Sequence, residues 1–304
     1  MRRGTKRIRA ASAAAACALF AALGTSAASA APQLLPIPVI PCGDSAALVH
    51  QIAVFNQVPA PTHIYLSRNC TYTVSAVDNN DNTGADAFPN ITGNIGIVGQ
   101  GSTIVRSSNQ RFRLFHVPAG GKLSLNNLTL ANGVSTGFPG GTVTDFGTLN
   151  LTDVTLTESV AALGGGLFVA PGATATVVRG AITVNHSTGP GGGVTNDGTL
   201  HMTGTLVSGN ASFREGGGID NDGGTLTLDD VAITHNMAIN GGGLANDGTA
   251  SVTVTSSSIT GNSASEGAGG VISSSSVVNS SSSIADNSPT NCIGGTVNIP
   301  NCSN

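Results

Sequence analysis

Three sets of aliphatic residues return along the chain at one period of 25 or 26 residues. The first set is Ile104, Leu130, Leu156, Ile182, Val207, Ile233, Ile259 and Ile284. The second is Ile97, Leu123, Leu149, Ala175, Leu200, Leu226, Val252 and Val277, and the third is Leu125, Leu151, Val177, Met202, Leu228 and Val254. Apolar positions that recur in register at a fixed period are typical of a repeat fold with one coil per period.

Within each period, short segments alternate apolar and polar residues, as in residues 147–151 and 224–228. This alternation, rich in Thr, Val and Ile, favours strands over helices. Glycine runs at 164–166, 191–193, 216–218 and 241–243 mark turns. A period this short does not accommodate a strand–helix–strand crossover, which needs about 30 residues or more. The pattern predicts an all-β fold: a single-stranded, right-handed parallel β-helix, a solenoid of about eight coils.

The first 30 residues have the features of a secretory signal peptide. Five cations between positions 2 and 9 precede an apolar stretch of 13 residues, at positions 11–23, and a small-residue cleavage site ends at Ala30. A transmembrane helix would need ~20 apolar residues. We therefore expect secretion to the extracellular space, with cleavage near Ala30, and no transmembrane anchor.

The ends of a solenoid need covers, because open strand edges recruit other chains. Residues 45–56 have the spacing of an amphipathic helix, with Asp44 or Ser45 as its N-cap. The sequence therefore predicts an N-terminal segment with a capping helix at 31–61. The next predicted part is a parallel β-helix at 62–288, with its first strands near 64–66 and 72–74. The last is a C-terminal cap with a cysteine pair at 289–304.

The four cysteines beyond the leader lie in two pairs, Cys42 with Cys70 and Cys292 with Cys302. Four cysteines allow three pairings. Only this local pairing avoids a bridge between opposite ends of the stack, and an exported chain meets an oxidising environment. The alternative, a metal site, does not match the usual zinc spacings.

Charge narrows the choice of partners. The whole chain has a net charge of −4; without the leader, seven cations and sixteen acids remain, a net charge of −9. Nucleic acid is not expected as a partner, because phosphate contacts need clustered Lys and Arg. The one basic cluster, Arg106, Arg111, Arg113 and Lys122, is interpreted as a solvated face. We expect a monomer whose partner is unknown, an extracellular polysaccharide or a cell-surface protein being the candidates.

Asparagine recurs three residues after the first aliphatic set. The positions are Asn185, Asn210, Asn236, Asn262 and Asn287. Stacked about 4.8 Å apart, their amides can bond from coil to coil. The pattern predicts a structural asparagine ladder.

An Asn-Asp-Gly motif at 196–198, 221–223 and 246–248, with the variant 145–147, repeats at the same period. One interpretation is a tight turn, since these residues tolerate left-handed backbone conformations. The other is a column of carboxylates, Asp145, Asp197, Asp222 and Asp247, that binds Ca²⁺. Both interpretations remain open, and no other cofactor is expected.

Catalytic candidates are few. A polysaccharide lyase needs carboxylates for Ca²⁺ and a base that removes a proton, and the weak candidates are Arg179 and Asp153, one coil apart. That pair is also interpreted as an inter-coil salt bridge. A glycoside hydrolase needs two acids facing a cleft, whereas the neighbours Asp229 and Asp230 would point to opposite faces of a strand.

The repeat itself resembles known families. Gly-Gly-Gly followed by Val194, Ile219 or Leu244, and then Ile-Thr-x-Asn as at 233–236, is similar to the repeats of polymorphic outer-membrane proteins. It also resembles secreted actinobacterial right-handed parallel β-helix repeat proteins, whose fold is that of the pectate-lyase-like superfamily. The resemblance implies a secreted, non-catalytic scaffold or adhesin. The alternative is a polysaccharide lyase or glycoside hydrolase of that superfamily.

Overall fold

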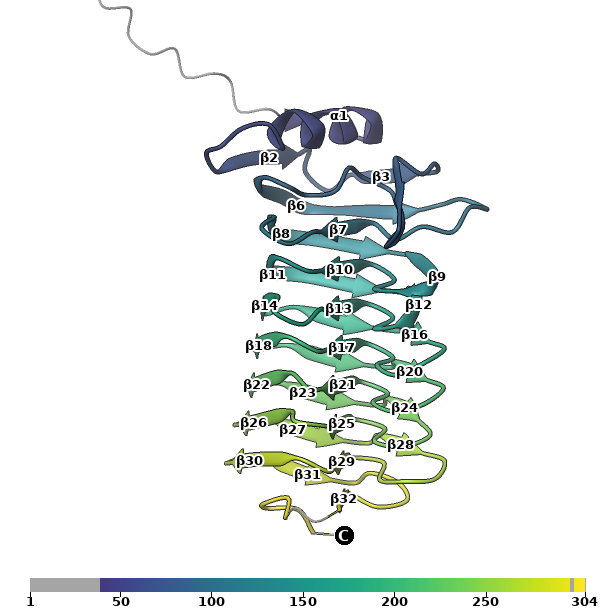
Figure 1. The fold of residues 1–304 in the computed structure, drawn as a ribbon, viewed down its shortest axis with the longest axis vertical. Coiled ribbons are helices and arrows are strands. Elements are labelled where there is room, and N and C mark those ends of the chain that lie inside the picture. Colours follow the sequence, from purple (N-terminus) through teal and green to yellow (C-terminus); the bar gives the residue numbers. More distant parts are fainter. Residues whose placement is uncertain (1–38, 296–297, 304) are drawn as a thin grey trace, which may run out of the picture. The chain divides into compact units, whose positions relative to one another are not determined.

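The computed structural model describes residues 39–295 and 298–303. These residues form an all-β parallel solenoid of about ten turns with a 26-residue spacing (Figure 1). The predicted leader, residues 1–30, lies outside the described residues. No helix in the described part of the chain has both the length and the apolar character needed to cross a membrane.

Three parallel sheets run along the stack, and the strands of each are joined to their counterparts in the next coil. The sixteen-stranded sheet contains β1 (Val39–Ile40), β2 (Thr62–Leu66), β3 (Thr71–Val74), β6 (Asn94–Arg106), β8 (Lys122–Ala131), β11 (Thr148–Thr157), β14 (Thr174–Val178), β15 (Ala181–Thr183), β18 (Thr199–Thr203), β19 (Leu206–Ser208), β22 (Thr225–Asp229), β23 (Ala232–Thr234), β26 (Ser251–Thr255), β27 (Ser258–Thr260), β30 (Ser276–Ser280) and β31 (Ser283–Ala285). In later coils it splits into two strands per coil.

The other sheets face different directions around each coil. The eight-stranded sheet contains β7 (Phe115–Val117), β10 (Val143–Asp145), β13 (Leu167–Val169), β17 (Val194–Asn196), β21 (Ile219–Asp222), β25 (Leu244–Asp247), β29 (Val271–Ser273) and β32 (Cys292–Gly294). The six-stranded sheet contains β9 (Val134–Pro139), β12 (Val160–Leu163), β16 (His186–Ser187), β20 (Ala211–Ser212), β24 (Met237–Ala238) and β28 (Ser263–Ala264). A separate antiparallel hairpin joins β4 (Asn79–Asp81) to β5 (Gly84–Asp86).

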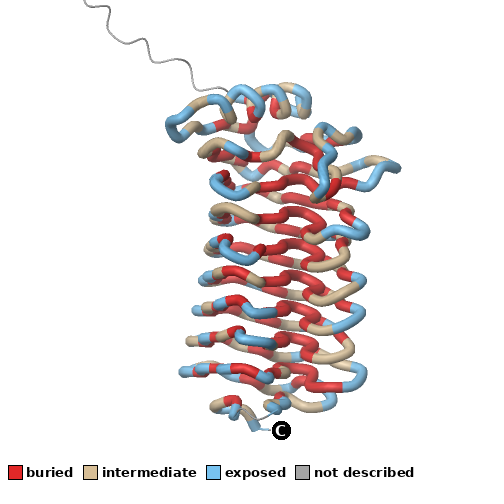
Figure 2. The backbone as a smooth tube through the Cα atoms, viewed as in Figure 1, coloured by how far each residue is buried: buried red, intermediate tan, exposed pale blue. Residues whose placement is uncertain are grey.

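The first aliphatic set forms a continuous buried column, as the period predicts. From Ile104 to Ile284 each member pairs with the next across one coil, and every member is at most 4% exposed. Buried segments alternate with exposed ones at every level of the stack (Figure 2). The core is therefore a stack of small aliphatic layers.

One position of the predicted register is wrong. Ile97 pairs with Leu125 and belongs to the third column, while Ile95 takes the place opposite Leu123. The register shifts between Val98 and Ser102, where β6 has two more residues than β8. This bulge lengthens the spacing within the strand, so counting back one period from Leu123 misses by two residues.

The number of coils also exceeds the predicted eight. Additional turns lie at the N-terminal end, where β1 pairs with β2 and both β2 and β3 pair with β6. Tyr72 extends the first column by pairing with Ile104, and it is fully buried. These partners are 32 residues apart because a long excursion, residues 75–92, separates β3 from β6. The early turns therefore do not show the 25–26-residue period.

Two corners of each coil have a left-handed backbone, which turns the chain sharply. One corner is occupied in successive coils by Asn127, Asp153, Arg179, Gly204, Asp230, Ser256 and Ser281. The other is occupied by Asn132, Glu158, Val184, Gly209, His235, Gly261 and Asp286. A β-branched side chain is unfavourable in this conformation, and Val184 has it with φ 56° and a 59% exposed side chain.

Replacing Val184 with Asn should therefore stabilise the protein. The equivalent corner at Asn132 already has an Asn, and the left-handed conformation costs most residues about 1–2 kcal/mol. We expect the free energy of unfolding to rise by about 1 kcal/mol, measured by denaturant titration. The matched control is Val278→Asn, an exposed valine on β30 without a left-handed backbone. An equal gain in both variants would contradict the explanation.

The helix among the described residues, α1 (Ser45–Phe55), lies next to the first strands (Figure 1). Asp44 is its N-cap: the Asp44 carboxylate accepts a hydrogen bond from the Ala47 N–H at 2.8 Å. Only Leu48 and Ile52 are buried on the helix, so its packed face is narrower than the sequence pattern indicates. Its role as a cap, like the right-handedness of the coils, stays a prediction.

Both local disulfides are present, as the cysteine pattern predicts. Cys42 is bonded to Cys70 beside α1 and β3, and Cys292 is bonded to Cys302 at the C-terminal end. Beyond the predicted boundary at residue 288, β32 adds one more strand by pairing with β29. The chain is thus cross-linked near the two ends of the sheets.

The predicted asparagine positions form hydrogen bonds along the inside of the stack. Each asparagine donates from its backbone N–H and its Nδ2 to the Oδ1 of the asparagine one coil further on, at 2.9–3.1 Å, in the series Asn185, Asn210, Asn236, Asn262 and Asn287. Each Nδ2 also donates to a backbone carbonyl at 2.8–3.0 Å. Ser159 begins the ladder as a donor, and Asn291 ends it as an acceptor.

A second ladder was not predicted. Asn196 donates to Asn221 at 2.6 Å, Asn221 to Asn246 at 2.8 Å, and Asn246 to Ser273 at 2.9 Å. The three asparagines belong to the Asn-Asp-Gly motif and are fully buried. The turn interpretation therefore holds only for part of the motif: its asparagine is an interior residue of the eight-stranded sheet, and its aspartate begins the turn.

Asn236→Ala should destabilise the protein by roughly 1–3 kcal/mol, because it leaves the backbone N–H of Asn210 buried without an acceptor and removes one of the two acceptors of Asn210 Nδ2. Denaturant titration measures the loss. The control is Asn150→Ala, on the exposed side of β11, with an expected change within about 0.5 kcal/mol. Equal losses in the two variants would argue against the ladder. Asn246→Ala is no control, since Asn246 is itself in a ladder.

Candidate functional site

An acidic cluster lies on the outer side of the eight-stranded sheet. Asp220 and Asp222 are on β21, Asp247 ends β25, and Glu215 precedes the glycine run that leads into β21. One carboxylate oxygen from each of Glu215, Asp220 and Asp247 lies within 4.8 Å of the other two. The turn that contains Glu215 and Gly216 folds back over the strand, and Gly216 leaves no room for a Cβ beside the Asp220 backbone.

Asp220 is the most buried member of the cluster, with 3% of its surface exposed. Burial, and to a smaller extent the charges of the neighbouring carboxylates, Asp222 first, together raise the pKa of Asp220 to about 8. Burial also raises the pKa of Glu215, and Asp247 adds to the effect through its charge and a shared hydrogen bond. Arg214 opposes the shift at Glu215. The cluster therefore concentrates negative charge that the protein compensates only weakly.

Asp197 extends the acidic surface by one coil. Burial and, to a smaller extent, the charge of Asp222 together raise its pKa to about 6. Asp222 and Asp247 are direct partners in the sheet register, one coil apart. The repeat thus brings Asp197, Asp222 and Asp247 into one row, as the predicted carboxylate column requires.

The predicted column is wrong at Asp145. Asp145 pairs with Val169, which in turn pairs with Asn196, so Asp145 occupies the asparagine position of the motif and points inward. When the motifs at 145–147 and 196–198 are matched aspartate to aspartate, the match is one residue out of the strand register. Neighbouring residues of a strand point to opposite faces, so this difference of one residue turns the Asp145 side chain inward. Glu215 and Asp220, which the sequence pattern did not single out, take its place in the cluster.

Asp145 is a buried acid with little compensation. It is fully buried, accepts a hydrogen bond from the Gly147 N–H at 2.9 Å with Oδ1, and has no partner for Oδ2 among the described residues. Burial raises the pKa of Asp145 from 3.8 to about 7, against the smaller opposite effect of the Gly147 bond. The folded protein therefore keeps a proton on Asp145 that the unfolded chain releases above about pH 4.

Asp145→Asn should remove this pH dependence. Because the pKa of Asp145 is raised on folding, its contribution to stability falls as the pH rises from about 4 to about 7, and then stays constant. The variant should gain stability over the parent by on the order of 3 kcal/mol between about pH 4.5 and pH 8. Denaturant titrations at the two pH values measure this difference. A difference that does not change with pH would contradict the assignment.

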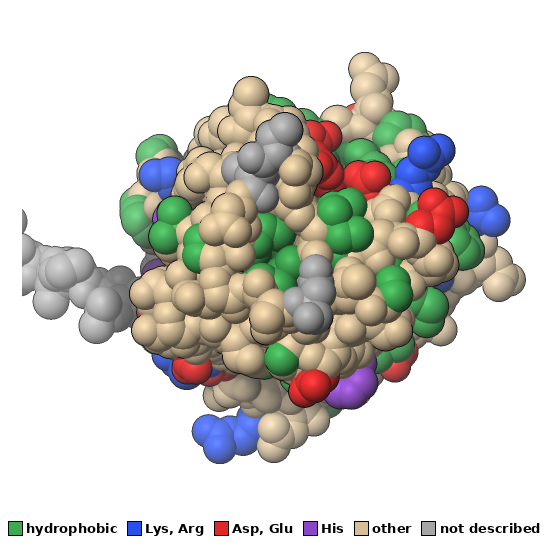
Figure 3. All heavy atoms as spheres, turned by 90° about the horizontal axis from the view of Figure 1, so that it is seen from below, with side chains coloured by type: hydrophobic (Ala, Val, Ile, Leu, Met, Phe, Trp, Pro, Cys, Tyr) green, Lys and Arg blue, Asp and Glu red, His purple; other side chains and the backbone are tan. Residues whose placement is uncertain are grey.

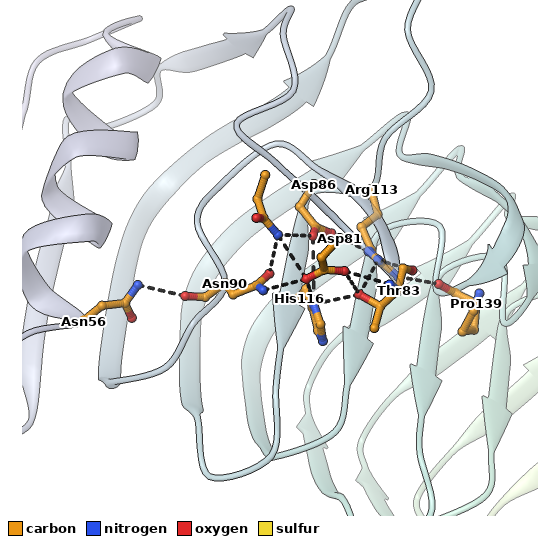
Figure 4. Close-up of polar contacts among 9 residues, drawn as sticks. Asn56, Asp81, Thr83, Asp86, Asn90, Arg113, His116 and Pro139 are labelled. Atoms are coloured by element: carbon orange, nitrogen blue, oxygen red, sulfur yellow. Dashed lines mark hydrogen bonds and ion pairs between the residues drawn. The ribbon is translucent and has the colours of Figure 1, made fainter.

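A second polar cluster fixes the excursion of residues 75–92 to the first coils (Figure 4). Arg113 is fully buried: its Nε donates to Asp86, and its Nη1 donates to the Pro139 carbonyl at 3.0 Å. The second guanidinium nitrogen, Nη2, donates to the carbonyl of Thr83. The interpretation of Arg113 as part of a solvated basic face is therefore wrong, because the β4–β5 hairpin folds over it.

His116 joins Asp81 and Asp86 at a spacing that metal ligands use. Its Nδ1 lies 3.1 Å from Thr83 Oγ1 and 3.9 Å from each of the two carboxylates. Burial and the charge of Arg113 lower the pKa of His116 to about 4, so it is neutral at pH 7. Burial raises the pKa of Asp86 to about 6, and Arg113 acts against this shift.

The polar partners of this second cluster are already provided by the chain. Asn79 donates to Asp86 at 3.2 Å and to Asn90 at 2.9 Å, and Asn90 donates to Asp81 at 2.9 Å. Asn56, just after α1, donates to the Asn90 carbonyl at 2.8 Å (Figure 4). A buried arginine beside the acids also opposes a cation there. We interpret this cluster as a structural clamp for the excursion.

Arg179 and Asp153 form an exposed ion pair away from both clusters. Two guanidinium nitrogens donate to the two carboxylate oxygens, each at 2.9 Å, and the side chains are 61% and 43% exposed. Asp153 raises the pKa of Arg179, and Arg179 lowers the pKa of Asp153. Both residues are at a left-handed corner of the sixteen-stranded sheet, and the acids of the cluster are on the eight-stranded sheet.

Apolar side chains gather on the six-stranded sheet. A cavity of about 320 Å³ there is lined mainly by apolar groups, among them Phe213, Met237 and Ile239. Phe213 and Met237 are largely exposed, and the Phe213 ring meets His186 edge to face at 4.8 Å.

In the view onto the C-terminal end, charged side chains lie around the margin of a mostly uncharged surface (Figure 3).

Comparisons with known proteins concern the fold. No family model matches the sequence, and no curated protein matches it. The chain is similar to a solved structure described as "Crystal structure of pectate lyase Pel9A", with a TM-score of 0.48 and 15% identity. The similarity covers 75% of this chain and 63% of that chain. At this level the likeness carries no argument about activity, and the resemblance to polymorphic outer-membrane repeats stays a prediction.

Proposed function

We propose that this protein is a secreted, non-catalytic β-helix scaffold or adhesin that presents its coil surfaces to an extracellular polysaccharide or a cell-surface protein. The leader pattern of residues 1–30 and the two disulfides support secretion. The observation that carries the proposal is the separation of the base candidate from the carboxylates. Arg179 is bonded to Asp153 at an exposed corner, while the clustered acids are on another sheet.

The structural use of the polar interior supports the same proposal. The buried asparagines bond along the stack, from one coil to the next, and this arrangement stabilises a long regular surface. The left-handed corners display side chains of several types along the stack without changing the backbone path. Such a surface suits binding, because it varies along the stack while the backbone that carries it stays constant.

The alternative function is a polysaccharide lyase or a glycoside hydrolase of the pectate-lyase-like superfamily. One observation favours it: Arg214, which is exposed, lies close enough to Glu215 to lower the pKa of that acid. A carboxylate cluster with a cation beside it has the residue types of a lyase site. Arg214 therefore replaces Arg179 as the base candidate under this alternative.

The purified protein is expected to release neither unsaturated ends nor reducing sugars from polygalacturonate or alginate, with or without Ca²⁺. Absorbance of unsaturated ends and a reducing-sugar assay measure turnover. Turnover abolished by Arg214→Ala and retained in Arg179→Ala would make the protein a lyase acting at the acidic cluster. Turnover abolished only by Arg179→Ala would place the site at the corner, and either result overturns the scaffold proposal.

A further inference from the structure

The acidic cluster on β21 and β25 contains a buried carboxylate without a partner. Only 3% of the surface of Asp220 is exposed, and its carboxylate receives no hydrogen bond or ion pair from the described residues. Its oxygen points toward the oxygens of Glu215 and Asp247, all three within 4.8 Å of one another. Buried polar groups are normally paired, and a buried charge is normally neutralised by a proton, a cation or a metal ion.

The preceding coil shows how the fold normally satisfies this position. Thr195 is the register partner of Asp220, and its hydroxyl donates to the Pro190 carbonyl at 3.1 Å. Pro190 and Glu215 each precede a glycine run and are in equivalent places in their coils. A carboxylate has no proton to donate to that carbonyl. Replacing Thr with Asp therefore removes a donor and adds a charge where the coil offers acceptors.

The following coil does not provide a donor either. Ala245 is the register partner of Asp220 on that side. Asp222 and Asp197 add further negative charge nearby, and Arg214 is the cation that acts on the cluster. Ser274 donates to Asp247 Oδ1 at 2.9 Å, which holds this carboxylate in place. The cluster is thus a set of oxygen acceptors around a position that needs positive charge.

We propose that Glu215, Asp220 and Asp247 bind one Ca²⁺ ion, with the oxygen of each carboxylate as a ligand. Three carboxylates without a His or Cys among them favour a hard cation over zinc or copper. A spread of up to 4.8 Å between ligand atoms fits Ca–O bonds of about 2.3–2.6 Å. The ion joins the turn before β21 to two successive coils. The Ca²⁺ site does not depend on the scaffold role, so either proposal can be wrong without affecting the other.

The test uses the purified chain after treatment with chelator, at neutral pH. Isothermal titration with CaCl₂ should show one ion per chain with a Kd on the order of 10⁻⁴ to 10⁻³ M or tighter. The melting temperature should rise by on the order of 3 °C at about ten times Kd. MgCl₂ should bind at least about tenfold more weakly, because three fixed carboxylates do not provide the regular octahedron that Mg²⁺ requires.

Asp220→Asn and Asp247→Asn should each weaken Ca²⁺ binding by roughly tenfold or more and abolish the shift in melting temperature. Using two variants keeps the test decisive if one of them folds poorly. The matched control is Asp229→Asn, an exposed aspartate at the end of β22, which should keep the parental affinity. If the parent protein shows neither heat of Ca²⁺ binding nor a rise in melting temperature, the proposal is wrong, and protons alone neutralise the cluster. Unchanged affinity in both variants would also overturn it.

Discussion

Parallel stacking at one coil spacing is the constraint on which the rest of this structure depends. Each residue lies about 4.8 Å from its counterpart in the next coil, so a buried polar side chain finds its partner mainly in its own column. Asparagine suits this arrangement because its amide both donates and accepts. In Asn236, for example, Oδ1 accepts from Asn210 and Nδ2 donates to Asn262. The ladder is therefore a consequence of the repeat.

The same constraint acts against acidic residues, because a carboxylate can only accept. The structure shows three outcomes. At the exposed corner, Asp153 faces Arg179 in the next coil, so opposite charges are stacked. Inside the eight-stranded sheet, Asp145 is uncharged below a pKa of about 7. At Asp220 the neighbours in the column are Thr195 and Ala245, and nearby side chains add further acids. This last position is where stacking leaves a demand for positive charge.

The first turns of the stack are stabilised differently. The excursion of residues 75–92 interrupts the period, and no ladder is available to hold it. Instead of a ladder, a buried arginine, Arg113, holds the excursion by donating hydrogen bonds to Asp86 and to the carbonyls of Thr83 and Pro139. A guanidinium with several fixed donors suits an irregular site, because it can satisfy acceptors from unrelated segments at once. In the first turns, irregular backbone therefore occurs together with a buried ion pair. In the later coils, regular backbone occurs together with amide ladders.

The sequence by itself determined the parallel solenoid, the buried aliphatic column from Ile104 to Ile284 and the positions of the asparagine ladder, because each is a property of residues at a fixed period. It also determined the local disulfide pairing, because the cysteines lie in two groups at opposite ends of the stack. It also determined that Asp197, Asp222 and Asp247 lie in one row. Only the tertiary structure decided the members of the site: Asp145 points inward, and Glu215 reaches Asp220 through a folded-back turn. It also decided the register of Ile97 and the burial of Arg113. Bulges, turns and excursions set side-chain direction locally, and a period counted along the chain contains no information about them.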